Sequence, residues 1–184
     1  AARMGAEVSF VGLRGDDGAG QILADALRAE GVDVSPFATT DGPSGRALVM
    51  VDAAGQNSII VVAGSNAKLS AADIDRAGRA VSGADVVVCQ LEVPLAAVQA
   101  AQKACTGVFV LNPAPAQVLP AELLAATDVL VVNETEYETV LGTPLPARLS
   151  EIAEVASRPT SPATIVATLG ARGAAVCTDA TVTL

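Results

Sequence analysis

The sequence predicts an α/β fold: a mostly parallel β-sheet with helices on both faces, and one β-hairpin outside that sheet. From residue 70 onward, short strand-like runs that are apolar throughout alternate with helical segments, as in parallel sheets whose two faces are both covered. Before residue 64, two strand-like runs follow each other with only a short turn between them, which indicates an antiparallel pair. The composition suits an aliphatic core, because 51% of the residues are hydrophobic but only 2% are aromatic.

The first 63 residues are predicted to hold a strand, a helix and the hairpin. Residues 7–13 have strand composition, and residues 18–31 repeat apolar side chains at helical spacing and end on a glycine, a common helix C-cap. Residues 46–52 and 57–63 are the two hairpin strands, joined by a turn at 53–56. Because no helix separates these strands, we expect the hairpin to leave the main sheet.

Beyond residue 63, helices and strands alternate. Ser70 and Asp73 form the pattern of a capping box, and Pro94 suits the first turn of a helix. The strand at 85–91 is too apolar for one of its faces to meet water. The complete predicted series is strands at 85–91, 107–111, 128–132 and 163–169, helices at about 71–82, 94–105, 120–127, 134–141 and 149–156, and a closing hairpin over 174–184.

Composition excludes several classes of function. The chain has 184 residues and no histidine, so a nucleophile activated by histidine and a metal site of the HExxH type are both excluded. With 11 basic and 20 acidic residues, the chain lacks the basic surface that nucleic acids and anionic membranes require. Its three cysteines, Cys89, Cys105 and Cys177, lie far apart in the sequence and are expected to be small core residues. Any chemistry must therefore use carboxylates, amides, arginine and a bound metal or nucleotide.

Size and hydropathy bound the organisation of the chain. A length of 184 residues suits one domain, and no apolar run approaches the roughly 20 residues that cross a bilayer. We therefore expect one domain and a cytoplasmic protein.

Polar or glycine residues follow four of the predicted strands. These residues are Gln90 with Glu92, Asn112, Asn133, and Thr168 with Gly170. In parallel α/β sheets, ligands bind beyond the carboxyl ends of the strands. The sequence therefore predicts a binding site at this edge of the sheet.

The segment "VLVVNETEYETVLG" (129–142) places acidic residues directly after a buried strand. Asn is a preferred N-cap residue, so with Asn133 at the N-cap, Glu134 and Glu136 fall in the first helical turn, where negative charge is favourable. One interpretation is that these carboxylates only cap the helix. The other is that one of them holds a hydrated Mg²⁺ on the phosphates of a nucleotide.

Three other segments have two interpretations each. "TLGARG" (168–173) is either a plain turn or part of a nucleotide pocket. Asp16 and Asp17 in "GDDGAG" are either turn and capping residues or a pair of metal ligands, and the capping interpretation is favoured. Glu92, just before Pro94, either starts a helix or contacts a ligand. Neither nucleotide-loop pattern, GxxxxGK[ST] or GxGxxG, occurs in the chain.

Taken in order, six segments resemble the PfkB carbohydrate kinase family, and within it the members that phosphorylate ribose. The segments are "GDDGAGQILADALRAEGVDV", "AGSNAKLS", "CQLEVPLAAV", "LNPAPAQVLPAELL", "NETEYETVLG" and "TLGARGA". The resemblance implies a three-layer α/β fold in which the hairpin at about 45–63 is a lid. It also implies ATP with Mg²⁺ as phosphoryl donor and the 5-hydroxyl of D-ribose as acceptor. Activation by a monovalent cation such as K⁺, common among such members, would depend on residues outside this chain.

The resemblance also implies roles for particular residues. Glu92 contacts a sugar hydroxyl. Asn133 and Glu136 form the N-x-x-E motif of the family, with Asn133 near the nucleotide phosphates and Glu136 acting on the metal through water. The nucleotide pocket is lined by Thr168, Leu169, Gly170, Ala171, Arg172 and Gly173.

The chain departs from the family pattern at both ends. It begins after the glycine-rich sugar-binding segment and ends before the D-T-x-G-A-G-D segment with its catalytic aspartate, so we expect no catalytic residue here and no turnover by these residues alone. Two alternatives stay open: another sugar or nucleoside kinase of the family, or a non-catalytic nucleotide-binding module. A homodimer through the exposed edge of the lid is also expected.

Overall fold

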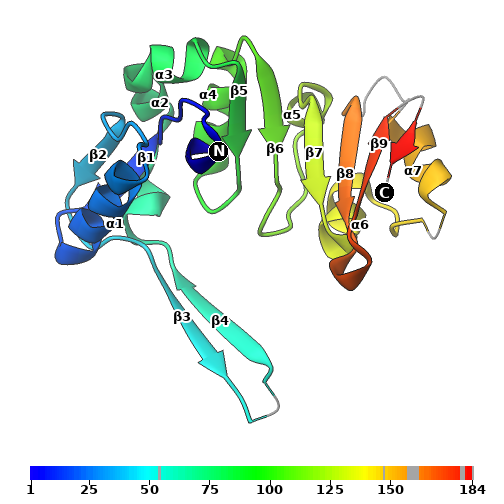
Figure 1. Ribbon diagram of the computed structural model, residues 1–184, viewed down its shortest axis with the longest axis horizontal. Coiled ribbons are helices and arrows are strands. Elements are labelled where there is room, and N and C mark those ends of the chain that lie inside the picture. The colour runs from blue at the N-terminus through cyan, green and yellow to red at the C-terminus, as the bar shows by residue number, and fades with distance from the viewer. Residues whose placement is uncertain (54, 147, 157–161, 179–180, 184) are drawn as a thin grey trace. The chain divides into compact units, whose positions relative to one another are not determined.

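The computed structural model describes residues 1–53, 55–146, 148–156, 162–178 and 181–183 (Figure 1). Its internal contacts divide the chain into two compact units. The first unit holds Ala1–Ala80 and Glu92–Ala97, and the second holds Val81–Leu91 and Val98–Leu184. Each unit is described by itself, and the single domain expected from the length stays a prediction.

A six-stranded sheet with the order β10-β9-β8-β7-β6-β5 forms the centre of the second unit. The strands β5 to β8 are parallel, whereas β9 and β10 are antiparallel to their neighbours. This arrangement confirms the mostly parallel sheet and the closing hairpin, of which residues 179, 180 and 184 lie outside the described residues. The bounds are β5 Val86–Cys89, β6 Val108–Leu111, β7 Val129–Val132, β8 Thr164–Thr168, β9 Ala174–Thr178 and β10 Val182–Thr183.

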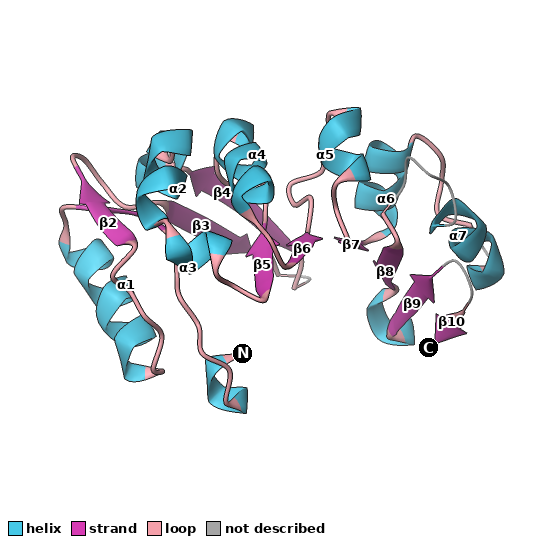
Figure 2. Cartoon of the chain, turned by 90° about the horizontal axis from the view of Figure 1, so that it is seen from above, coloured by secondary structure: helices cyan, strands magenta, loops and turns pink. Residues whose placement is uncertain are grey.

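Helices connect the parallel strands as predicted. They are α4 (Leu95–Ala104), α5 (Ala121–Ala125), α6 (Glu134–Leu141) and α7 (Leu149–Ala156), and Figure 2 shows α5, α6 and α7 along one side of the sheet. The core beneath them is aliphatic with two aromatic rings, Phe109 and Tyr137, both at most 1% exposed. Among the described residues, no helix has both the length and the apolar character needed to cross a membrane.

The strand β5 is less buried than its composition predicts. Val86 and Val88 are 52% and 67% exposed, so the expectation that neither face meets water is wrong for this strand. Val86 and Val88 alternate with the half-buried Val87 and Cys89, so they share one face of the strand, and that face is left open. Among the described strands, β5 is also the last in the order, with β6 as its one neighbour.

The first unit contains a two-stranded parallel sheet of β1 (Gly12–Gly15) and β2 (Phe37–Thr40), with α1 (Gly18–Ala29) between them in sequence. The strand predicted at 7–13 therefore begins only at Gly12, because the described residues before it show a single bridge, from Ser9 to Asp33. The strand β2 was not predicted. The helix predicted over 71–82 is interrupted: α2 (Ala71–Ala77) stops at Gly78, whose φ of 53° is not helical, and α3 (Arg79–Ser82) follows.

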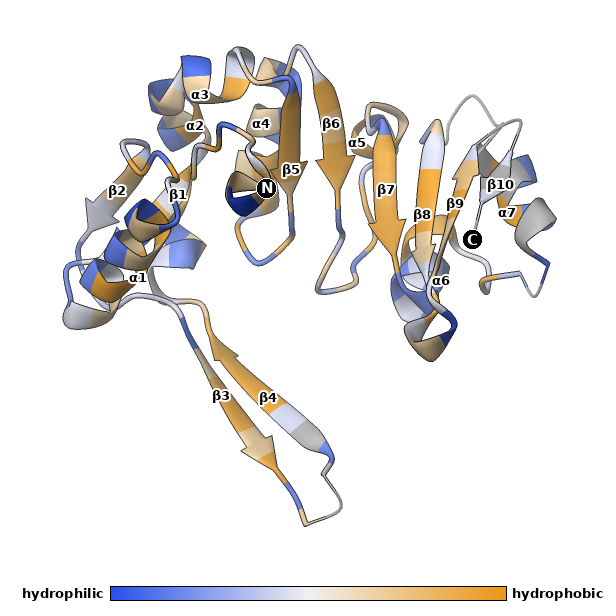
Figure 3. Cartoon of the chain, viewed as in Figure 1, coloured by the Kyte–Doolittle hydropathy of each residue, from blue (hydrophilic) through white to orange (hydrophobic). Residues whose placement is uncertain are grey.

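The predicted hairpin is confirmed as a separate two-stranded sheet. Its strands β3 (Arg46–Val51) and β4 (Asn57–Val62) are antiparallel, and within the described part of the chain they pair with no other strand. Figure 3 shows that both are strongly apolar. Eight of their large apolar side chains are between 50% and 67% exposed: Leu48, Val49, Met50, Val51, Ile59, Ile60, Val61 and Val62.

Candidate active site

The N-terminus of α6 carries the predicted motif in a closed capping box. Asn133 is the N-cap residue, and its Oδ1 accepts a 2.9 Å hydrogen bond from the backbone N–H of Glu136. In return, Oε2 of Glu136 accepts a 2.9 Å hydrogen bond from the backbone N–H of Asn133. The spacing N-x-x-E dictates this geometry, because residues N-cap and N3 face each other across the first helical turn.

Only one carboxylate oxygen of Glu136 is used by this arrangement. Oε2 receives the Asn133 N–H and lies 3.5 Å from Nδ2 of Asn112, whereas no group among the described residues bonds Oε1. The capping box of α2 differs, because there Oδ2 of Asp73 accepts from Ser70 and Oδ1 pairs with Arg76 at 2.6 Å. Capping alone therefore leaves half of the Glu136 carboxylate available for another partner.

Asn112, directly after β6, lies beside the capping box of α6. Its Nδ2 donates a 2.9 Å hydrogen bond to the carbonyl of Val131 at the end of β7 and approaches Glu136, while its Oδ1 lies 3.5 Å from Nε2 of Gln90. The sequence places Asn112 at a strand end but suggests no role for it. The signal was present in the strand order, since β6 and β7 are neighbours and their carboxyl ends must meet.

The glycine-bearing turn after β8 lies beside the same helix. Oγ1 of Thr168 donates to the carbonyl of Val132 at 3.3 Å, and Arg172 pairs with Glu134 of α6 at 3.7 Å. The turn itself closes with a 2.8 Å hydrogen bond from the Leu169 N–H to the Gly173 carbonyl. The structure thus brings together the predicted motif of α6 and the predicted turn at 168–173, within the second unit.

The glycines at the two ends of this turn have a backbone that other residues rarely adopt. Gly170 has a φ of 59° and Gly173 a φ of 91°, both in the region that side chains with a Cβ disfavour. No atom lies within 4 Å of where a Cβ would stand at either position. These glycines therefore serve backbone conformation and leave open space, which a ligand could approach.

The chemistry of this edge suits a polyanion better than a bare metal. No group of three or more His, Cys, Asp or Glu side chains that could cage a metal occurs in the described parts of the chain. Mg²⁺ needs no such cage, because in nucleotide sites it keeps several waters and is held by one or two carboxylates and by phosphates. A helix N-terminus adds backbone N–H donors for phosphate oxygens, so the residues present fit Mg²⁺ bound to a nucleotide.

Two predicted positions lie in the first unit. Glu92 is exposed and is the first residue of the segment Glu92–Ala97 in the first unit. Its role in sugar binding stays a prediction. Asp17 is the N-cap of α1, with Oδ1 accepting from the Gly20 N–H at 2.8 Å. The interpretation of Asp17 as a capping residue is therefore confirmed.

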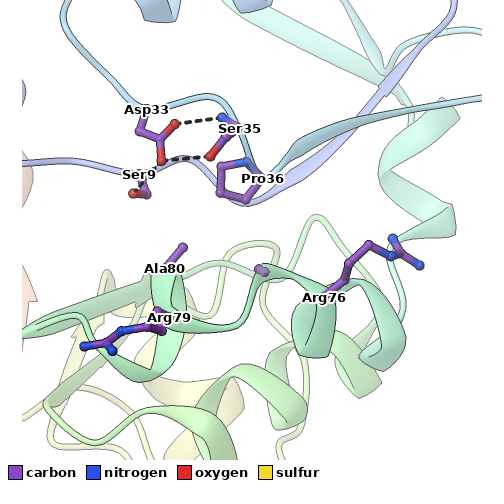
Figure 4. Close-up of a pocket in the computed structure, with 8 residues that line it drawn as sticks. Ser9, Asp33, Ser35, Pro36, Arg76, Arg79 and Ala80 are labelled. Atoms are coloured by element: carbon purple, nitrogen blue, oxygen red, sulfur yellow. Dashed lines mark hydrogen bonds between the residues drawn. The ribbon is translucent and has the colours of Figure 1, made fainter.

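The first unit also has an open polar pocket of about 410 Å³ (Figure 4). None of the predicted site residues lines it. Its acidic group, Asp33, already accepts hydrogen bonds from Ser35 at 2.8 and 3.0 Å, and Figure 4 shows Arg76 and Arg79 pointing away from that carboxylate. The polar groups of this pocket do not converge on a common point, so we assign it no role.

Comparison with known proteins places these observations in a family. The model of the pfkB family carbohydrate kinases matches residues 1–184. The ribokinase of Staphylococcus aureus is 40% identical over 77% of this chain and 48% of its own length, and that of Haemophilus influenzae is 35% identical over 94% of this chain and 58% of its own. The chain therefore spans about half the length of these relatives.

Solved structures agree with the sequence comparison. The ribokinase of Arabidopsis thaliana, solved in complex with ribose and ATP, superposes with a TM-score of 0.80 at 29% identity, over 98% of this chain and 61% of its own. This likeness confirms the predicted ribokinase-like α/β fold. The chain belongs to the pfkB family of carbohydrate kinases.

Proposed function

We propose that this chain carries the nucleotide-binding part of an ATP-dependent kinase that phosphorylates the 5-hydroxyl of D-ribose. The family supports a sugar kinase, and the similar ribokinases support ribose as the sugar. The observation that carries the proposal is the half-used carboxylate of Glu136, held beside a helix N-terminus and a glycine-bearing turn.

In this proposal, each residue at the strand ends has a distinct task. The N-terminus of α6 faces the phosphates near Asn133, and the turn from Thr168 to Gly173 forms one wall of the nucleotide pocket. Bound Mg²⁺ supplies charge neutralisation for the transferring phosphoryl group. Glu136 orients waters of that ion through Oε1, while its Oε2 stays in the capping box and fixes the direction of the carboxylate.

Glu92 is proposed to hold the sugar through one of its hydroxyls. Its exposure leaves the carboxylate accessible to a ligand, and a carboxylate is a strong acceptor for sugar O–H groups. In the full-length protein, Glu92→Gln is expected to raise KM for ribose while leaving the affinity for Mg-ATP unchanged. Equal effects on both ligands would contradict a sugar-specific role.

The hairpin is proposed to act as the lid and to pair with the hairpin of a second copy. Contiguous apolar surface of this kind marks an interaction site, and β3 and β4 have no described partner strand beyond each other. Sedimentation of Ile60→Lys should show loss of the dimer. Val118→Lys is the matched control, because Val118 is also exposed, at 79%, but lies outside the hairpin.

Calorimetry and a sugar panel test the main proposal. The 184-residue chain is titrated with ATP in the presence of Mg²⁺ and again with EDTA, and the affinity is expected to be higher with Mg²⁺ present. The full-length protein is then assayed for ADP formation with D-ribose, D-fructose and adenosine, and ribose is expected to give the highest kcat/KM. Absence of nucleotide binding, or a preference for another acceptor, would contradict the proposal.

A further inference from the structure

The root of the hairpin is fixed to β1 and α1 by buried side chains. Just before β3, Ser44 is 1% exposed, and its Oγ accepts a 3.0 Å hydrogen bond from the N–H of Gly15. Just after β4, Ser65 is fully buried and its Oγ donates to the carbonyl of Leu13 at 3.0 Å. Both ends of the hairpin are thus held by polar contacts with the same short strand, β1.

The packing around this root leaves no spare room. A Cβ on Gly15 would lie 2.6 Å from the carbonyl carbon of Pro43, and one on Gly20 would lie 2.9 Å from Oγ of Ser44. Gly64, on the other side, has a φ of 53° and would place a Cβ 2.7 Å from the Pro43 carbonyl oxygen. Any side chain at these three positions would therefore collide with the root, which only glycine allows to pack this closely.

One charged side chain connects this root to the helix. Oδ1 of Asp17 accepts from Oγ of Ser44 at 2.7 Å, and Oδ2 accepts from the backbone N–H of Ser44 at 3.0 Å. Arg46, the first residue of β3, lies 3.6 Å from Oδ2. Hydrogen bonds to a carboxylate are shorter and stronger than those between neutral groups, so Asp17 makes the strongest contacts of the root while it also caps α1.

We propose that Asp17 is the positioning residue of the hairpin, and that its carboxylate sets how the hairpin stands on β1 and α1. The functional consequence rests on the proposed kinase activity, in which the hairpin is the lid over the sugar. Loss of the Asp17 contacts frees the root, so that the hairpin samples many orientations and closes on the sugar less often. This predicts a higher KM for the sugar with kcat little changed.

The test separates positioning from helix capping. Serine caps helices as well as aspartate does, but in Asp17→Ser a single shorter side chain cannot reach both groups of Ser44. Amide hydrogen exchange is measured by NMR on the 184-residue chain. The amides of Ser44 and Ser65 are expected to exchange at least tenfold faster in Asp17→Ser, while that of Ala24 in α1 changes less than twofold. Asp25→Asn, which removes an exposed charge from the same helix, is expected to change none of them.

A second variant approaches the same contact from the hairpin. Ser44→Ala leaves Asp17 free to cap α1, and it is expected to speed the exchange of Ser65 to a similar extent. In the double variant the acceleration should be smaller than the product of the two single accelerations, because the bond from the Ser44 hydroxyl to Asp17 is lost in both. Unchanged root amides in Asp17→Ser, or equal acceleration at Ala24, would overturn the proposal. These readouts need no catalysis, so failure of the kinase assignment would leave them interpretable.

Discussion

At the N-termini of both α1 and α6, a carboxylate accepts hydrogen bonds, but the two carboxylates serve different purposes. At α1, the Asp17 carboxylate accepts hydrogen bonds through both oxygens, from Gly20 and Ser44. At α6, Oε2 of Glu136 accepts a hydrogen bond in the capping box, whereas Oε1 has no hydrogen bond from any described residue. A fully used carboxylate holds structure together, whereas a half-used one is available to a ligand.

The surroundings of the two carboxylates support the same distinction. Asp17 faces a root so tight that glycines are required beside it. Glu136 lies near a turn whose glycines have open space around them. We therefore expect substitutions at the hairpin root to act on stability, and those at the strand ends of the second unit to act on nucleotide binding.

Gly15→Ala should give the largest effect on stability. Its Cβ would overlap backbone atoms of residues 42–44, and overpacking of this kind costs about 1–3 kcal/mol, with backbone overlap at the upper end. Urea unfolding followed by circular dichroism measures the loss. The control is Gly18→Ala, where nothing lies within 4 Å of the new Cβ and a change below about 0.5 kcal/mol is expected. Equal stability of the two variants would show that the root is not tightly packed.

Acid should weaken the contact at α1. Hydrogen bonds from the Ser44 hydroxyl, and next from the Gly20 and Ser44 N–H groups, lower the pKa of Asp17 from its ordinary value of 3.8 to about 2. A lowered pKa in the folded state means that the stabilisation is complete above pH 3.8 and is lost as the pH falls toward 2. Thermal unfolding from pH 5 to pH 2 should therefore show a steeper loss in the unaltered chain than in Asp17→Ser. Parallel curves would contradict this assignment.

The cap and the metal role of α6 can be separated by two substitutions. Asn133→Ala removes the N-cap and should lower stability by about 1 kcal/mol. Glu136→Gln keeps a side chain that closes a capping box, so its stability should change by less than about 0.5 kcal/mol. Chemical denaturation checks both values. A large loss in Glu136→Gln would mean that its charge serves the fold.

The smallest effect is expected at the ion pair of Arg172 with Glu134. Both side chains are more than half exposed, and exposed pairs contribute about 0–1 kcal/mol, reduced by salt. Arg172→Gln should therefore change the unfolding free energy by less than about 0.5 kcal/mol at physiological ionic strength. A loss above about 1 kcal/mol would show that the pair holds the turn against α6.

Much of this fold could be predicted because the strand and helix periods are clear in the sequence. The order of elements from residue 85 onward, the hairpin and the N-cap at Asn133 all follow from local patterns. The break of the predicted helix at Gly78 is local, but the other failures depend on partners distant in sequence. Strand β2 pairs with β1 on the other side of α1 in sequence, and the exposure of Val86 and Val88 depends on which elements cover their face of β5.

The site was predicted in the same uneven way. Position after a strand was enough to select Asn133, the acidic residues that follow it and the turn at 168–173, which the structure brings together. It was the resemblance to the family motif that singled out Glu136. The sequence could not show that one oxygen of Glu136 is left over, since that depends on the rotamer in the capping box. Nor could it show that Asp17 reaches Ser44, because the two are 27 residues apart in sequence.

The most direct measurement of the central claim is the affinity of Glu136→Gln for ATP, by calorimetry with Mg²⁺ and with EDTA. Because groups that orient metal-bound ligands typically contribute 10- to 100-fold, we predict that the Kd with Mg²⁺ rises about tenfold or more while the affinity in EDTA is unchanged. Asp73→Asn, in the fully used capping box of α2, should bind as the unaltered chain does. An unchanged Kd for Mg-ATP in Glu136→Gln would contradict the account.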